Sequence, residues 1–148
     1  MSLYCPKCGV WAYKNHKCNI FSLIPATRDA RPLADKLYSL GFDLLSAACF
    51  THPVEGSIYE HSIIVDIEFN RQYIPTILGD LPAGWRYYLE TVSEDHWPIS
   101  ALAYGETYVW LGFETVEERI KQIVTGFVEY LDTRDKVALG AIMMLSDC

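Results

Sequence analysis

The alternation of apolar and polar positions is clearest in residues 61–69. Apolar side chains recur at every second position, and polar ones fall mostly between them. One set is Ile63, Val65, Ile67 and Phe69, and the other is Ser62, Ile64, Asp66 and Glu68. Successive side chains of a strand point to opposite faces of a sheet. The pattern therefore predicts a strand with one face on a core and the other at least partly in water.

A helical period replaces this alternation after Thr115. Thr115 and Glu118 form a capping-box pattern, which is typical of a helix start. The apolar positions that follow are spaced for one helix face: Val116, Ile120, Ile123, Val124, Phe127, Val128 and Leu131. We predict a long helix here that packs its apolar stripe on the sheet. A second helix is predicted from residue 133 through Met144, and its apolar surface is a candidate homodimer contact.

Weaker patterns complete the expected fold. They predict strands at 19–25, 42–50, 85–92, 99–104 and 107–113, and helices at 27–40 and 72–78. Thr27 is the expected N-cap of the first helix and Gly41 its C-cap. Gly105 and Glu106 suit a two-residue hairpin turn between the last two strands. Over residues 19–92 the element order resembles a ferredoxin-like or ACT-like βαββαβ unit. The predicted class is α+β with a mainly antiparallel sheet.

The first eighteen residues carry a candidate metal site. Its four possible ligands are Cys5, Cys8, His16 and Cys18. Four such ligands complete a tetrahedral zinc site and leave no position for water or substrate, so the zinc would be structural. Gly9, directly after Cys8, permits a backbone conformation that lets amide groups face the sulfurs.

The segment Cys5-Pro6-Lys7-Cys8-Gly9 resembles the knuckle of zinc ribbons and rubredoxin-like sites. The second half departs from that pattern, because His16-Lys17-Cys18 replaces a second Cys-x-x-Cys. We predict Zn²⁺ on all four ligands and a division into a zinc-binding knuckle, 1–18, and an α+β domain, 19–148. The alternatives are iron, a three-ligand site with His16 nearby, and a redox Cys-x-x-Cys pair.

Charge restricts the possible partners. The formal net charge is −7, yet no acidic residue precedes Asp29. An acidic body repels phosphate backbones, so nucleic acid is a possible partner only for the N-terminal lobe. There Trp11 lies between the ligand pairs with Lys14 and Lys17 close by in the sequence, a combination that suits stacking on a base. Alternatively, Trp11 packs the metal lobe onto the body.

Cysteine usage and hydropathy indicate the compartment. Five cysteines, an odd number, and a start that lacks the features of a secretory signal argue against a disulfide framework. The chain also lacks an apolar run of about 18 residues. We therefore expect a cytoplasmic protein that does not enter a membrane.

Aromatic residues gather between positions 85 and 113. Four of them share a parity within their predicted strands: Tyr88, Tyr104, Tyr108 and Trp110. Such a set forms a binding surface if it is exposed, because Tyr and Trp are favoured at interfaces. If the long helix covers it, the set is only core.

The leading functional hypothesis is a non-enzymatic interaction protein with a structural zinc lobe. Its partner would be another protein, bound through the aromatic face or the metal lobe. One alternative is a nucleic-acid adaptor that acts through the basic N-terminal lobe. The other is an enzyme or small-ligand sensor with a pocket between sheet and helix that uses Asp66, Glu68 or His96. The sequence contains no Gly-rich phosphate loop, Gly-x-Ser-x-Gly elbow or His-Glu-x-x-His motif, which counts against the commonest enzyme classes.

Overall fold

The computed structural model describes residues 1–12, 23–90 and 99–146. Its described part is an α+β fold with a mixed seven-stranded sheet and three α-helices. The strands are β1 (Ser2–Cys5), β2 (Val10–Trp11), β3 (Ile24–Ala26), β4 (Leu44–Pro53), β5 (Glu60–Phe69), β6 (Trp85–Glu90) and β7 (Ile99–Val109). The helices are α1 (Arg31–Ser39), α2 (Val116–Asp132) and α3 (Lys136–Ser146), with a 3₁₀ turn at Arg28–Ala30. The strand order is β2-β1-β3-β4-β5-β7-β6.

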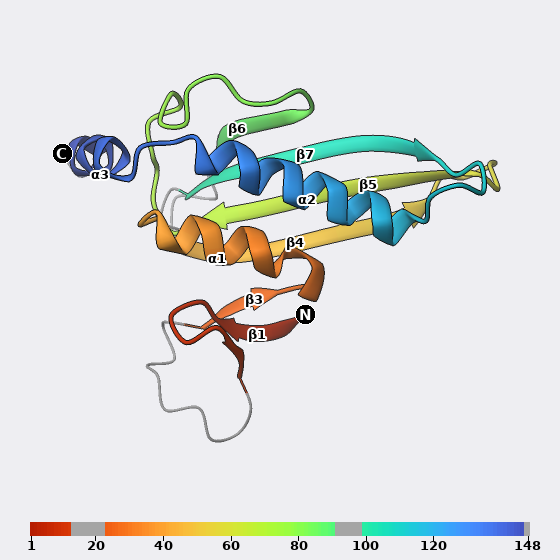
Figure 1. Cartoon of the computed structure of the whole chain (residues 1–148), viewed down its shortest axis with the longest axis horizontal. Helices are drawn as coiled ribbons and strands as arrows, with labels where there is room; N and C mark the ends of the chain where they lie inside the picture. Colours follow the sequence, from red (N-terminus) through yellow and green to blue (C-terminus); the bar gives the residue numbers. More distant parts are fainter. Residues whose placement is uncertain (13–22, 91–98, 147–148) are drawn as a thin grey trace.

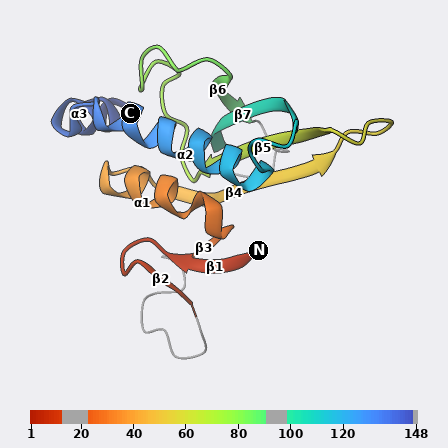
Figure 2. The same ribbon diagram turned by 45° about the vertical axis from the view of Figure 1, so that its right-hand side comes forward.

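The centre of the sheet is three long antiparallel strands, β4, β5 and β7. Both α1 and α2 cover the same face of this sheet, and they lie side by side across it (Figures 1 and 2). The alternation predicted for residues 61–69 is confirmed, because Ile63, Val65, Ile67 and Phe69 are fully buried under these helices. Asp66 and Glu68 point to the opposite face of the sheet and are half-buried.

The helix start predicted at Thr115 is also confirmed, with Thr115 as the N-cap. The Thr115 Oγ1 accepts a hydrogen bond from the Glu118 amide at 3.1 Å, and α2 begins at Val116. Five residues of the predicted stripe form its buried side: Ile120, Ile123, Val124, Phe127 and Leu131. Phe127 stacks on Trp85 of β6 with ring centroids 3.9 Å apart. This contact joins α2 to the edge of the sheet.

The ferredoxin-like topology is not confirmed. In a split βαβ arrangement another strand separates the two parallel strands, whereas β3 and β4 are direct neighbours here. The helix predicted at 72–78 is also wrong, since this segment forms turns around Pro75. Its side chains nevertheless join the core: Tyr73 is buried and makes edge contacts with Phe42 and Phe69.

The predicted hairpin turn at Gly105 and Glu106 is wrong as well. Both residues lie inside β7, which runs without a break from Ile99 to Val109. Gly105 pairs with Ile64 of β5 and does not take the positive φ that a tight hairpin turn requires of glycine. Pairing along the whole length of β5 holds β7 extended.

The N-terminal strands extend the same sheet. The β1–β2 hairpin reaches the body through β1, which pairs with β3. Tyr4 of β1 is buried, and its hydroxyl donates a hydrogen bond to the carboxylate of Asp35 on α1. Burial, aided by this hydrogen bond, raises the pKa of Tyr4 to about 12, so the hydroxyl keeps its proton at neutral pH. The first strand is thereby fixed to the first helix.

Candidate functional site

Two of the four predicted zinc ligands lie in the described structure. Cys5 ends β1 and is buried, and Cys8 is exposed in the turn before β2. The turn is closed by the Gly9 amide, which donates to the Cys5 carbonyl at 2.8 Å, and Gly9 has a φ of +68°. This is the glycine conformation expected after a Cys-x-x-Cys knuckle. His16 and Cys18 lie outside the described residues, so the ligand set stays a prediction.

Trp11 packs against the body of the protein. Its ring lies 4.9 Å from the Tyr4 ring, and the Arg28 guanidinium lies 5.0 Å from its centroid. These contacts favour the interpretation in which Trp11 packs the N-terminal strands onto the body. Lys14 and Lys17, the other residues of the predicted nucleic-acid contact, lie outside the described part of the chain.

The four aromatic residues predicted to share a face lie in different places. Tyr88 is on the face of the sheet opposite the helices, where its hydroxyl lies 3.4 Å from the Asp66 carboxylate. Tyr104 is buried beside Trp85, and Tyr108 is partly buried and donates to the Glu114 carbonyl. Trp110 follows β7 and is exposed. Of these four residues, Trp110 is the one that belongs to the candidate site.

Two adjoining loops at the end of the sheet where α2 begins carry large apolar side chains that are exposed. The group, called the apolar tip below, consists of Ile58 (80% exposed), Tyr59 (54%), Trp110 (41%), Leu111 (71%) and Phe113 (94%). Its members come from the β4–β5 loop and the β7–α2 loop, at the right-hand end of Figure 1. The Trp110 amide donates to the Tyr59 carbonyl at 2.8 Å, which holds the two loops together.

A hollow of about 280 Å³ borders the apolar tip. It is lined by Thr51, His61, Trp110, Thr115, Val116 and Glu117. Trp110 thus belongs to both the tip and the hollow, and Glu117 adds an acidic residue to the hollow's lining. The nearby His52 does not join His61 in a common site. His52 pairs with Ser62 while His61 pairs with Pro53, so the two imidazoles lie on opposite faces of the sheet.

An ion pair fixes the start of α2 to the sheet and so positions the β7–α2 loop. The Arg119 guanidinium donates to both carboxylate oxygens of Glu106 on β7, at 2.6 and 2.7 Å. The Tyr104 hydroxyl donates to the same carboxylate at 2.5 Å. The hydrogen bonds from Arg119 are the main reason that the pKa of Glu106 lies below its ordinary value.

Replacing Glu106 tests this clamp. Glu106→Gln should lower the free energy of unfolding by about 1.5–3 kcal/mol at pH 7, the usual contribution of hydrogen bonds to a charged group. Because the folded-state pKa is depressed, the stabilisation is present above the unfolded value of about 4.3 and is lost as pH falls through the folded value. Urea unfolding of both proteins from neutral to acidic pH should therefore show the difference shrinking below about pH 4.3. A pH-independent difference would contradict the assignment.

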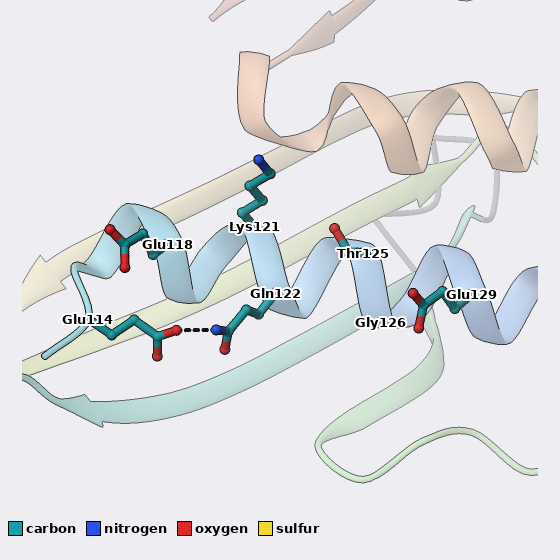
Figure 3. Close-up of a pocket in the computed structure, with 7 residues that line it drawn as sticks. All are labelled: Glu114, Glu118, Lys121, Gln122, Thr125, Gly126 and Glu129. Atoms are coloured by element: carbon teal, nitrogen blue, oxygen red, sulfur yellow. Dashed lines mark hydrogen bonds between the residues drawn. The ribbon is translucent and has the colours of Figure 1, made fainter.

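A second hollow, of about 450 Å³, runs along the outer side of α2 (Figure 3). It is lined by Glu114, Glu118, Lys121, Gln122, Thr125, Gly126 and Glu129. The Gln122 amide donates to the Glu114 carboxylate at the end nearest the apolar tip, as the dashed line shows. We call this hollow the α2 groove. Three carboxylates and one ammonium group give it a net negative charge.

Comparison with protein-family models, with curated proteins and with solved structures finds no match to this chain. Among the described residues, none of the helices combines the length and the apolar character needed to cross a bilayer.

Of the five residues of the apolar tip, only Trp110 was predicted from the sequence to belong to a binding surface. Residues 109–113 read Val-Trp-Leu-Gly-Phe, an apolar run without the alternation of a half-buried strand. The run ends two residues before Thr115, the expected start of a helix, so part of it had to form a loop. An apolar run without alternation, placed directly before a helix start, therefore indicates an exposed apolar loop. His96, named as a possible catalytic group, lies outside the described residues.

Proposed function

We propose that this chain is a non-enzymatic interaction protein that binds another protein through the apolar tip. The observation that carries the proposal is the exposure of five large apolar side chains on two adjoining loops. Scattered exposed apolar residues are ordinary on protein surfaces, whereas contiguous ones mark interaction sites. The tip also contains Trp and Tyr, which are common among the residues that dominate binding energy at interfaces.

Selection from a displayed library of random linear peptides tests this proposal. The full chain should enrich peptides whose affinity falls about thirtyfold or more in the double variant Leu111→Ser/Phe113→Ser, since a single dominant interface residue contributes about 2 kcal/mol or more. Val137→Ser is the matched control, because Val137 is 81% exposed but lies on α3. Equal binding by wild type and the double variant would refute the role of the tip.

We also propose that a structural Zn²⁺ held by Cys5, Cys8, His16 and Cys18 stabilises the N-terminal lobe. Support comes from the closed turn that presents Cys5 and Cys8, with Gly9 in the left-handed region. Elemental analysis of purified protein should find about one zinc ion per chain. Cys8→Ser should lose most of it, and Cys148→Ser, outside the motif, should retain it. Metal-free wild-type protein would contradict the proposal.

A further inference from the structure

We infer that the partner segment is basic as well as apolar: it places apolar side chains on the tip and Lys or Arg side chains on the acidic surface around the start of α2. This inference rests on the proposed function and adds the chemistry of the partner. It is carried by the charges that border the tip, by the α2 groove and by the hollow beside Trp110.

The two loops that carry the tip, together with the adjoining ends of β5, β7 and α2, are acidic. Residues 54–61 and 109–118 contain five carboxylates, Glu55, Glu60, Glu114, Glu117 and Glu118, and no Lys or Arg. The nearest cation in sequence, Arg119, already donates to both oxygens of Glu106. The partial positive charge at the start of α2 is met by Glu117 and Glu118 in its first turn. The border of the tip therefore carries more negative than positive charge.

The α2 groove continues this negative surface away from the tip. Glu114 marks its near end, directly after Phe113 in the chain, and Glu129 lies toward its far end (Figure 3). Lys121 is the one cationic side chain among its lining residues. A segment whose apolar residues cover the tip can thus run along α2 with its cationic residues beside the glutamates.

The hollow beside Trp110 adds a place for one cationic side chain. Trp110 and Glu117 both line this hollow. An Arg or Lys side chain can be attracted both to an aromatic face and to a carboxylate. An acidic or neutral partner would leave this negative surface uncompensated.

The same charges disfavour two other occupants. A two-fold contact between copies of this chain would place identical acidic borders against each other. An anionic membrane surface would be repelled by the carboxylates that surround the apolar residues. A basic, apolar segment of another protein meets both the apolar and the electrostatic requirement.

The peptides selected by the full chain test the inference through their composition and their salt dependence. Tip-dependent binders should be enriched in Lys and Arg next to Leu, Phe or Trp. Their affinity should fall as the ionic strength rises from about 0.1 M to about 1 M, which shortens the Debye length from about 10 Å to about 3 Å. Glu118→Lys should weaken binding by about tenfold, through loss of one attraction and gain of one repulsion.

Asp80→Lys is the matched charge control. Asp80 is also exposed, but its carbonyl accepts a hydrogen bond from Tyr130 near the C-terminal end of α2, away from the tip. Affinity in this variant should stay within about twofold of wild type. An equal loss in both variants would show that net charge alone matters and would overturn the inference.

The remaining outcomes separate the inference from the proposed function. Tip-dependent binders without basic residues would overturn the inference and leave the function standing. Binders unaffected by Leu111→Ser/Phe113→Ser would overturn both. Sedimentation of the chain alone and flotation with phosphatidylcholine vesicles complete the test. Self-association or vesicle binding abolished by that double variant would show that a second copy or a lipid surface occupies the tip, and would overturn the inference.

Discussion

Phe127→Ala is expected to lower the free energy of unfolding by about 3–5 kcal/mol, the usual cost of removing a buried aromatic ring. Phe127 is buried between α2 and the sheet, stacked on Trp85 and in contact with Tyr130, whose ring centroid lies 5.3 Å away. Truncation removes the apolar contact and leaves a cavity, because neighbouring strands and helices restrict collapse. The effect should appear in urea unfolding followed by circular dichroism.

Val137→Ala provides the reference for this substitution. Val137 also lies on a helix, but its side chain is largely exposed, so its replacement should change the free energy of unfolding by less than about 0.5 kcal/mol. If Phe127→Ala cost no more than this control, α2 would not pack on β6 as described. The position of the β7–α2 loop, and with it the apolar tip, would then need revision.

Gly84→Ala should destabilise the protein by about 2–5 kcal/mol for two separate reasons. Gly84 has a φ of +88°, which costs a residue with a side chain about 1–2 kcal/mol. A Cβ at this position would also lie 2.5 Å from Cε2 of Tyr104. The Tyr104 ring cannot withdraw easily, because it packs on Trp85 and its hydroxyl binds Glu106. The resulting overpacking adds about 1–3 kcal/mol.

Gly56→Ala separates these two costs. Gly56 has a similar φ of +82°, but a Cβ there would meet nothing within 4 Å. Its replacement should therefore show the backbone cost alone, and the difference between the two variants measures the clash with Tyr104. Equal unfolding free energies for the two variants would contradict the close approach of Tyr104 to Gly84.

The sequence predicted correctly those elements whose local pattern matches the burial they have in the fold. The alternation in residues 61–69 predicted β5, because one face of that strand is covered by helices and the other is not. Thr115 and Glu118 predicted the start of α2, because the hydrogen bond that caps a helix forms between residues three apart. The strand is recognised from its single buried face, and the helix start from a hydrogen bond between residues close in the chain.

Predictions failed where contacts distant in sequence overrode local preference. Gly105 suits a turn, but pairing with Ile64 holds it extended inside β7. Residues 72–78 have a partly helical pattern, but burying Tyr73 against Phe42 and Phe69 requires an irregular path. Tyr104 and Tyr108 share a parity with Trp110, yet only Trp110 extends beyond the strand into an exposed loop. Parity alone does not tell which part of a strand a helix covers.

By itself, the sequence determined that the chain folds as α+β, where its long strand and its capped helix lie, and which two cysteines share a glycine-closed turn. These features depend on periodicity and on hydrogen bonds between near neighbours. Only the tertiary structure decided the strand order and brought Ile58 and Tyr59 beside Trp110, Leu111 and Phe113. That surface depends on the pairing of β5 with β7, whose partners lie far apart in the chain. The pattern of a strand fixes which of its faces is buried, but it does not say which other strand lies beside it.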